Sequence, residues 1–105
     1  MATVKRSSVA LTTTDATEVG QAGASGGAYN IHVVNISGSS ATVTVAVNSS
    51  SATIADAGTL MKDYTVPSSG NPTVIKGIVL VANEYVNAEA NGANKVVVTM
   101  SGYDQ

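Results

Sequence analysis

The sequence contains no cysteine, no tryptophan and no phenylalanine, and tyrosine supplies all of its 4% aromatic residues. Without cysteine the chain has no disulfide, no thiol nucleophile and none of the thiolate ligands of the common structural zinc sites. So few aromatic rings leave little surface for stacking on sugars or nucleobases. The core must therefore be built mainly from Val, Ile, Leu and Ala, and the receptor-binding classes that depend on aromatic platforms are disfavoured.

Charge is also scarce, because only 11% of the 105 residues are charged, against about 25% in an average domain. A chain of this length folds as one domain and buries roughly 60 to 70% of its unfolded surface. A small domain has much surface to cover, so the missing charges imply a surface of Ser, Thr, Asn and Ala, or one partly buried against a partner. We expect a permanent protein partner.

The balance of charge argues against two other partners. The formal net charge is −2, and Lys5-Arg6 is the only adjacent basic pair, whereas binding to nucleic acid needs a clustered basic patch. No run of about 18 apolar residues is present, and the start Met1–Ala10 lacks the apolar region of a signal peptide. We expect no nucleic acid and no membrane as partners, and synthesis in a cytoplasm without classical secretion.

The densest run of strand-forming residues extends from Tyr29 to Val47. Its two arms, Tyr29–Ile36 and Ala41–Val47, are separated by the small polar residues Ser37–Ser40, which favour a turn. The second arm alternates strictly, with three valines on one face and two threonines and an alanine on the other: Val43, Val45 and Val47, then Thr42, Thr44 and Ala46. This pattern predicts a β-hairpin whose valine face packs in the core, with the single histidine, His32, in its first arm.

Further strands are predicted at intervals of about ten residues, and no amphipathic helix is. Residues 73–81 are almost continuously apolar, as in a strand covered on both faces, with Gly77 as a bulge or a point of close backbone approach. Asn91-Gly92 favours a type I′ turn between strands at 85–90 and 95–103. The segment 53–58 fits a single helical turn closed by Gly58 or an irregular loop, and we favour the loop. Three more strands are predicted: one that begins near Val9, one over 17–21 and one over 60–66.

Together these features predict an all-β fold, an antiparallel β-sandwich or jelly-roll-like domain of about seven or eight strands. Residues 1–8 are polar and are predicted to form a short flexible N-terminal arm, followed by a single sandwich domain over 9–105. Deleting Met1 to Ser8 is accordingly expected to leave a folded sandwich.

Catalytic chemistry finds little support among the residues. His32 is the only histidine, so a catalytic triad would have to be built on it, and its place between apolar residues in mid-strand favours a structural role. The seven carboxylates are scattered without the spacing of a calcium loop, and Gly20–Gly27 lacks the spacing of a phosphate loop. We expect no enzyme activity and no catalytic, cofactor-binding or metal site. Asn35 and Asn48 match glycosylation sequons, but because we expect no classical secretion, we expect neither to be glycosylated.

The order of several segments between Thr12 and Gly102 is similar to the order in a known group of proteins. They are Thr12–Thr17, Ile31–Ser37 running into Ala41–Val45, Leu60–Pro67, Gly77–Val86 and Val98–Gly102. In this order the chain resembles small all-β structural proteins of tailed bacteriophages, especially cyanophage-like ones. The loop Gly23–Gly27 departs from the short Pro-Gly turn that such proteins often have. The resemblance implies a virion component assembled in the host cytoplasm, with no family active site to carry over.

Two functions from different classes are compatible with this resemblance. One is a capsid decoration (cement) protein that bridges shell subunits and contacts the major capsid protein or other virion proteins through its N-terminal arm, Val4, Lys5, Arg6, Ser7 and Ser8. The other is a tail, baseplate or fibre-associated module, for which host glycan is a candidate ligand. A hydrolase that uses His32 is a third reading, outside the virion. Because seven or eight strands leave edges to cover, self-association as a trimer or dimer is also expected.

Overall fold

Eight strands and one 3₁₀ turn, η1 (Asp56–Gly58), account for most of the computed structural model, which describes residues 2–68 and 70–105. The strands are β1 (Thr3–Ala10), β2 (Thr17–Gln21), β3 (Gly27–Asn35), β4 (Ala41–Asn48), β5 (Thr59–Val66), β6 (Thr73–Leu80), β7 (Tyr85–Ala90) and β8 (Val96–Asp104). The irregular loop favoured for segment 53–58 is wrong for its second half, because Asp56–Gly58 forms the 3₁₀ turn, while residues 53–55 are irregular. No helix in the described part of the chain is long and apolar enough to span a membrane.

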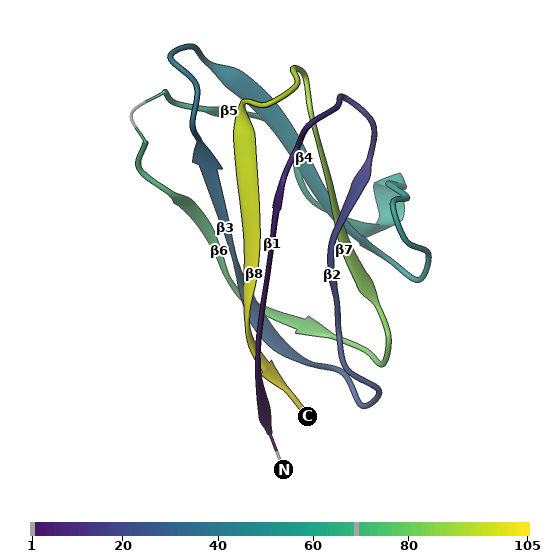
Figure 1. Ribbon diagram of the computed structural model, residues 1–105. Helices are drawn as coiled ribbons and strands as arrows, with labels where there is room; N and C mark the ends of the chain where they lie inside the picture. The colour runs from purple at the N-terminus through teal and green to yellow at the C-terminus, as the bar shows by residue number, and fades with distance from the viewer. Residues whose placement is uncertain (1, 69) are drawn as a thin grey trace.

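The strands form two four-stranded sheets that pack face to face (Figure 1). Sheet A has the order β1-β8-β3-β6 and sheet B the order β2-β7-β4-β5, and every pairing is antiparallel. Consecutive strands lie in opposite sheets except β4 and β5, which is the strand order of a jelly roll. The predicted all-β sandwich is confirmed. Both termini lie at the same end of the sandwich (Figure 1).

Two predicted hairpins are wrong, although their strands are present. β3 and β4 lie in different sheets, as do β7 and β8, so the turns at Ser37–Ser40 and Asn91-Gly92 connect one sheet to the other. The buried side chain of Asn35 shows how the first crossing is held. Its Nδ2 donates to the carbonyls of Ser39 and Val66 at 2.7 and 3.0 Å, so the turn is tied to a strand of the other sheet. Turn residues specify that the chain reverses, but they do not specify which strand becomes its neighbour.

The predicted flexible arm over residues 1–8 is also wrong. Residues Thr3 to Ser8 belong to β1, which pairs with β8 from Thr3↔Asp104 to Ala10↔Val97. Alternation in β1 is hard to see in the sequence because its inward positions are partly polar. Ser7 Oγ donates to the carbonyl of Val19 at 2.7 Å, and Lys5 Nζ donates to the carbonyl of Gln21. The sandwich therefore begins at Thr3; Met1 lies outside the described residues.

The core is aliphatic, as the composition predicts. Val43 and Val45 of the predicted valine face are fully buried, and Val47 packs against the core from its margin. Tyr29 is the largest buried side chain and the only tyrosine in the core of the described residues, with 2% of its surface exposed. The valine-rich strands of both sheets thus meet on one continuous apolar layer.

β6 differs from its prediction as a strand covered on both faces. It is the outer strand of sheet A, and Val79 is 78% exposed. Of the two roles predicted for Gly77, the bulge is the one present, because the register with β3 shifts between Tyr29 and Ile31 and Gly77 has φ +67°. No close backbone approach requires this glycine, since a Cβ there would meet no atom of the other described residues within 4 Å. A left-handed φ favours glycine there.

Candidate functional site: the outer face of sheet A

The outer face of sheet A consists of the side chains that its four strands direct away from the core. In β1 these are Val4, Arg6, Ser8 and Ala10, because their neighbours Lys5, Ser7 and Val9 are more buried and point inward. The other strands add outward residues in register with them. Side chains from positions about 100 residues apart in the chain therefore share one surface.

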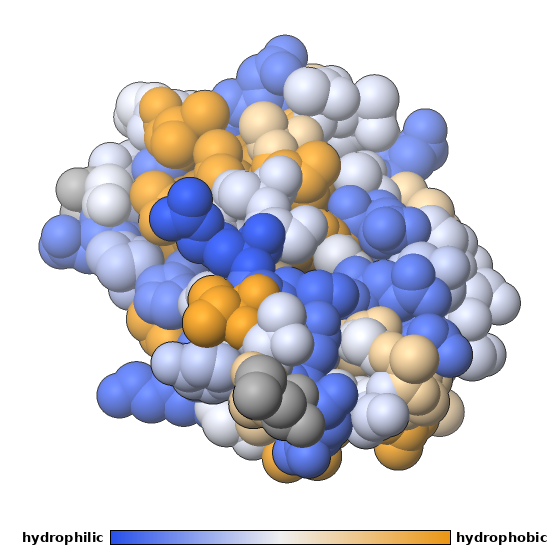
Figure 2. Space-filling view, turned by 60° about the horizontal axis from the view of Figure 1, so that its bottom comes forward, coloured by the Kyte–Doolittle hydropathy of each residue, from blue (hydrophilic) through white to orange (hydrophobic). Residues whose placement is uncertain are grey.

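An exposed apolar row crosses this face at the end of the sandwich that carries the termini. Strand register places Val4 beside Tyr103, Tyr103 beside Ala28, and Ala28 beside Val79. Val4, Tyr103 and Val79 are 73%, 58% and 78% exposed. We call these four residues the terminal row. Figure 2 looks toward this end of the molecule and shows apolar patches next to strongly polar side chains.

The next two rows of the face are polar. Arg6, Ser101 and Asn30 form the first, where Asn30 Oδ1 accepts a hydrogen bond of 2.9 Å from the backbone N–H of Gly77 in the bulge of β6. In the second, Ser8 Oγ and Thr99 Oγ1 share a hydrogen bond of 2.8 Å.

His32 continues the second row and is half-buried on this face. Its partners across the strands are Thr99 on β8 and Val74 on β6. The row contains no carboxylate that could orient the imidazole as in a catalytic triad. Within residues 2–68 and 70–105, no group of three or more His, Asp or Glu side chains is placed to hold a metal ion.

A surface hollow of about 330 Å³ lies between the terminal row and the first polar row, lined by Val4, Lys5, Arg6, Asn30, Ser101, Gly102 and Tyr103. The Arg6 guanidinium has no ion pair or hydrogen bond with any described residue. Gly102 is required where β8 passes β3, because a Cβ at this position would overlap the carbonyl oxygen of Ala28.

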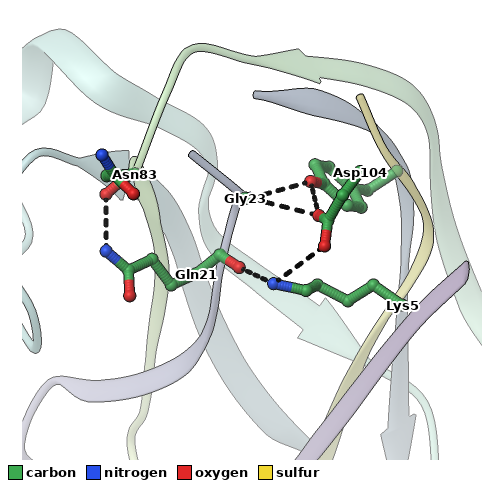
Figure 3. Close-up of polar contacts among 6 residues, drawn as sticks. Lys5, Gln21, Gly23, Asn83 and Asp104 are labelled. Atoms are coloured by element: carbon green, nitrogen blue, oxygen red, sulfur yellow. Dashed lines mark hydrogen bonds and ion pairs between the residues drawn. The ribbon is translucent and has the colours of Figure 1, made fainter. Parts of the chain in front are cut away.

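Directly beneath the hollow, a polar cluster joins both ends of the chain to the loop after β2. Lys5 Nζ lies 3.4 Å from Asp104 Oδ2, and the backbone N–H of Gly23 donates to Asp104 Oδ1 at 3.1 Å (Figure 3). The Tyr29 hydroxyl donates to the same Oδ1. The Asp104 carboxylate therefore faces inward, and both of its oxygens contact groups of the same chain.

The cluster perturbs two pKa values in opposite directions. The hydrogen bond from Tyr29, helped by Lys5, lowers the pKa of Asp104 because both interactions stabilise the carboxylate. Burial, followed by the hydrogen bond to Asp104, raises the pKa of Tyr29 to about 12. The negative charge of Asp104 and the positive charge of Lys5 neutralise each other, so Arg6 is the unpaired charge among the described residues at the hollow.

The two outer faces of the sandwich carry opposite charges. On sheet A the charged side chains are Arg6 and, in the bulge opposite Asn30, Lys76. On sheet B, Glu18 and Glu89 point outward, and Asp63 lies beside Thr44. Exposed Lys62 is the one lysine of this sheet and lies 3.9 Å from Asp56, so acidic side chains are in excess on this face. A second hollow, of about 270 Å³, lies on this acidic face and is lined by Thr14, Thr42, Thr44, Asp63, Glu89, Ala90 and Asn91.

The five residues predicted as an interface thus divide into two groups. Val4, Arg6 and Ser8 lie on the outer face of sheet A, whereas Lys5 and Ser7 point inward and bind carbonyls of β2. Sequence reasoning missed Ala28, Val79 and Tyr103. Tyr103 continues the alternation of Val97, Thr99 and Ser101, so that signal was present, but the row itself depends on the pairing of distant strands.

Comparison of the chain with models of known protein families, with curated proteins and with solved structures yields no match.

Proposed function

We propose that the protein is a non-enzymatic structural component of a tailed-bacteriophage virion, and that it decorates the capsid shell by binding the major capsid protein through the outer face of sheet A. The resemblance of the sequence to small phage structural proteins supports the class. The exposed terminal row supports the choice of surface.

The terminal row is the observation that carries this choice. Val4 and Val79 project from opposite edges of sheet A, with Tyr103 and Ala28 between them, and all four are solvent-exposed. Fully burying one valine side chain contributes about 1.5 kcal/mol or more to association. Contiguous exposed apolar surface rimmed by polar residues is typical of protein interaction sites.

Binding of the capsid protein through a face of sheet A agrees better with the sandwich edges than binding through an edge strand. On one side of the sandwich, Lys5 and Ser7 of β1 bind backbone carbonyls of β2, so the two sheets close on each other. On the other side, β5 and β6 both have register shifts with their neighbours, and bulges hinder pairing with another strand. The trimer or dimer expected from open edges stays a prediction.

The copy number of the protein in purified particles tests the proposal. Quantitative gel densitometry against the major capsid protein should give hundreds of copies per particle, since decoration follows the lattice of the shell. A handful of copies would instead assign the protein to the tail or baseplate.

The second candidate is a tail, baseplate or fibre-associated module that binds host glycan, and the hollow on sheet B favours it. Hydroxyl, carboxylate and amide groups line that hollow, and such groups bind sugar hydroxyls. If this candidate is right, a glycan array should show binding that Asp63→Asn abolishes and Arg6→Gln leaves unchanged. Binding that neither variant alters would contradict a glycan site in this hollow.

A further inference from the structure

We infer that the hollow on sheet A is a recognition site for an extended acidic segment of the partner protein, in which an Asp or Glu side chain pairs with Arg6 and an apolar side chain two residues away packs on Val4 and Tyr103. The inference deepens the proposed attachment through this face and rests on it for the partner's class. It identifies the partner by chemistry: a strand-like segment with an apolar residue and a carboxylate at alternate positions.

The hydrogen-bond donors around the hollow favour an anionic ligand. Arg6 has no carboxylate partner, and neither Ser101 Oγ nor Asn30 Nδ2 has an acceptor among the described residues. The nearest acid, Asp104, faces the opposite side of β8 and is occupied by Tyr29, Gly23 and Lys5. A guanidinium with two neutral donors beside it matches a carboxylate, which accepts up to four hydrogen bonds.

The spacing on the face sets the spacing in the ligand. Val4 and Arg6 are outward neighbours two residues apart on β1, and they pair with Tyr103 and Ser101 on β8. Outward residues on one strand are about 7 Å apart, which equals the repeat of side chains on one side of any extended segment. A partner strand lying along β1 and β8 therefore brings its apolar and acidic side chains over Val4 and Arg6 together.

Charge favours a different protein over a second copy joined by the same face. A two-fold dimer of sheet A on sheet A would bring Arg6 and Lys76 toward their own counterparts, where like charges repel. A second copy could dock only through its acidic sheet B, which would build an open chain of molecules. That arrangement is an outcome of the test below.

The test is an NMR titration of the isotope-labelled full chain with the peptide acetyl-Val-Ser-Glu-amide and its control acetyl-Val-Ser-Gln-amide. We expect the Glu peptide to shift the amide signals of Arg6, Ser101, Gly102 and Tyr103, and the Gln peptide to bind about tenfold more weakly. Arg6→Gln should remove this difference between the peptides, whereas Lys62→Gln, which removes one charge from the other sheet, should preserve it. Equal binding of both peptides to the wild type, or shifts confined to sheet B, would overturn the inference.

Two further measurements separate this inference from the proposed function. Selective binding of the Glu peptide combined with a handful of copies per particle would support the site and overturn capsid decoration. Hundreds of copies with no selectivity between the peptides would overturn the site and support decoration. Concentration-dependent chain growth in sedimentation that Arg6→Gln abolishes would assign the face to a second copy and overturn the inference.

Discussion

Asp104 receives contacts from three separate parts of the chain: Lys5 in β1, Gly23 in the loop after β2, and Tyr29 in β3. Each donates to the carboxylate near the end of β8 (Figure 3). The cluster thus lies at the end of the sandwich where both termini are found (Figure 1). Hydrogen bonds to a charged group are stronger than those between neutral groups. The cluster therefore holds β1 and β8 in place under the hollow that contains Arg6.

Tyr29→Phe should lower the free energy of unfolding by about 1 to 2 kcal/mol, because it removes the hydroxyl that donates to Asp104 and leaves the buried ring in place. Urea denaturation at neutral pH measures the change. Tyr103→Phe is the matched control, since Tyr103 is exposed and its hydroxyl makes no hydrogen bond with a described residue. An equal loss in both variants would contradict the structural role of the buried hydroxyl.

The raised pKa of Tyr29 predicts a loss of stability in alkali. Its pKa rises from 10.0 to about 12 on folding, so its contribution is complete below pH 10 and is lost as the pH rises toward 12. Spectrophotometric titration should show a tyrosine that ionises with a pKa of about 12. This step should be missing in Tyr29→Phe, and a step near pH 12 that persists in this variant would contradict the assignment.

Asp104 predicts the opposite dependence in acid. Its pKa is lowered on folding, so its contribution is present above the usual value of 3.8 and is lost as the pH falls through the folded pKa. Asp104→Asn should therefore be less stable than the wild type at neutral pH and approach it in acid, as measured by urea midpoints across this range. A difference independent of pH would show that packing, not charge, accounts for the effect.

At the scale of elements, β1 is the strand whose role changes most between sequence and structure. It pairs with β8 along its whole length, and its inward side chains Lys5 and Ser7 join sheet A to the edge of sheet B. An edge strand with such cross-sheet contacts is part of the fold. Val4 and Arg6, the residues of the proposed interface, therefore lie on a paired strand of the sandwich.

Deletion of residues 1–8 should unfold the domain, which reverses the expectation from the sequence. The deletion leaves most of the edge of β8 without its hydrogen-bonded neighbour and removes the donors to the carbonyls of Val19 and Gln21. Circular dichroism should show loss of the β spectrum, while removal of Met1 and Ala2 alone, which precede β1, should preserve it. A folded protein after the longer deletion would restore the interpretation of a separate arm.

At the scale of the whole molecule, the size of the outer face limits how strongly one copy can bind. Four strands about 4.8 Å apart and eight residues rising about 3.4 Å each give a face of roughly 500 Å². Stable interfaces bury about 800 Å² on each partner. Contact with one flat partner is therefore weak, and a position that bridges two subunits of a shell adds the area and avidity that one contact lacks.

The double variant Val4→Ser/Val79→Ser should lower the copy number on particles while leaving the fold intact, because both side chains are mostly exposed and contribute little to the core. Gel densitometry of particles assembled with the variant measures occupancy, and a urea denaturation curve checks the fold. Ile36→Ser is the control, since Ile36 is 60% exposed just beyond the other end of β3. Equal occupancy for all three proteins would exclude the terminal row as the attachment surface.

The sequence by itself determined that the chain is all-β, where most strands lie, and that the valine face of β4 turns toward the core, because alternation with a period of two is a local property of an extended chain. It also pointed to Val4 and Arg6. The tertiary structure decided the rest: that β3 and β4 cross between sheets, that β1 is a strand, and that Val79, Ala28 and Tyr103 extend the surface begun by Val4. The reason is that the pairing of strands depends on how two sheets pack over one core. That packing is determined by contacts between residues far apart in the chain, which local turn residues do not specify.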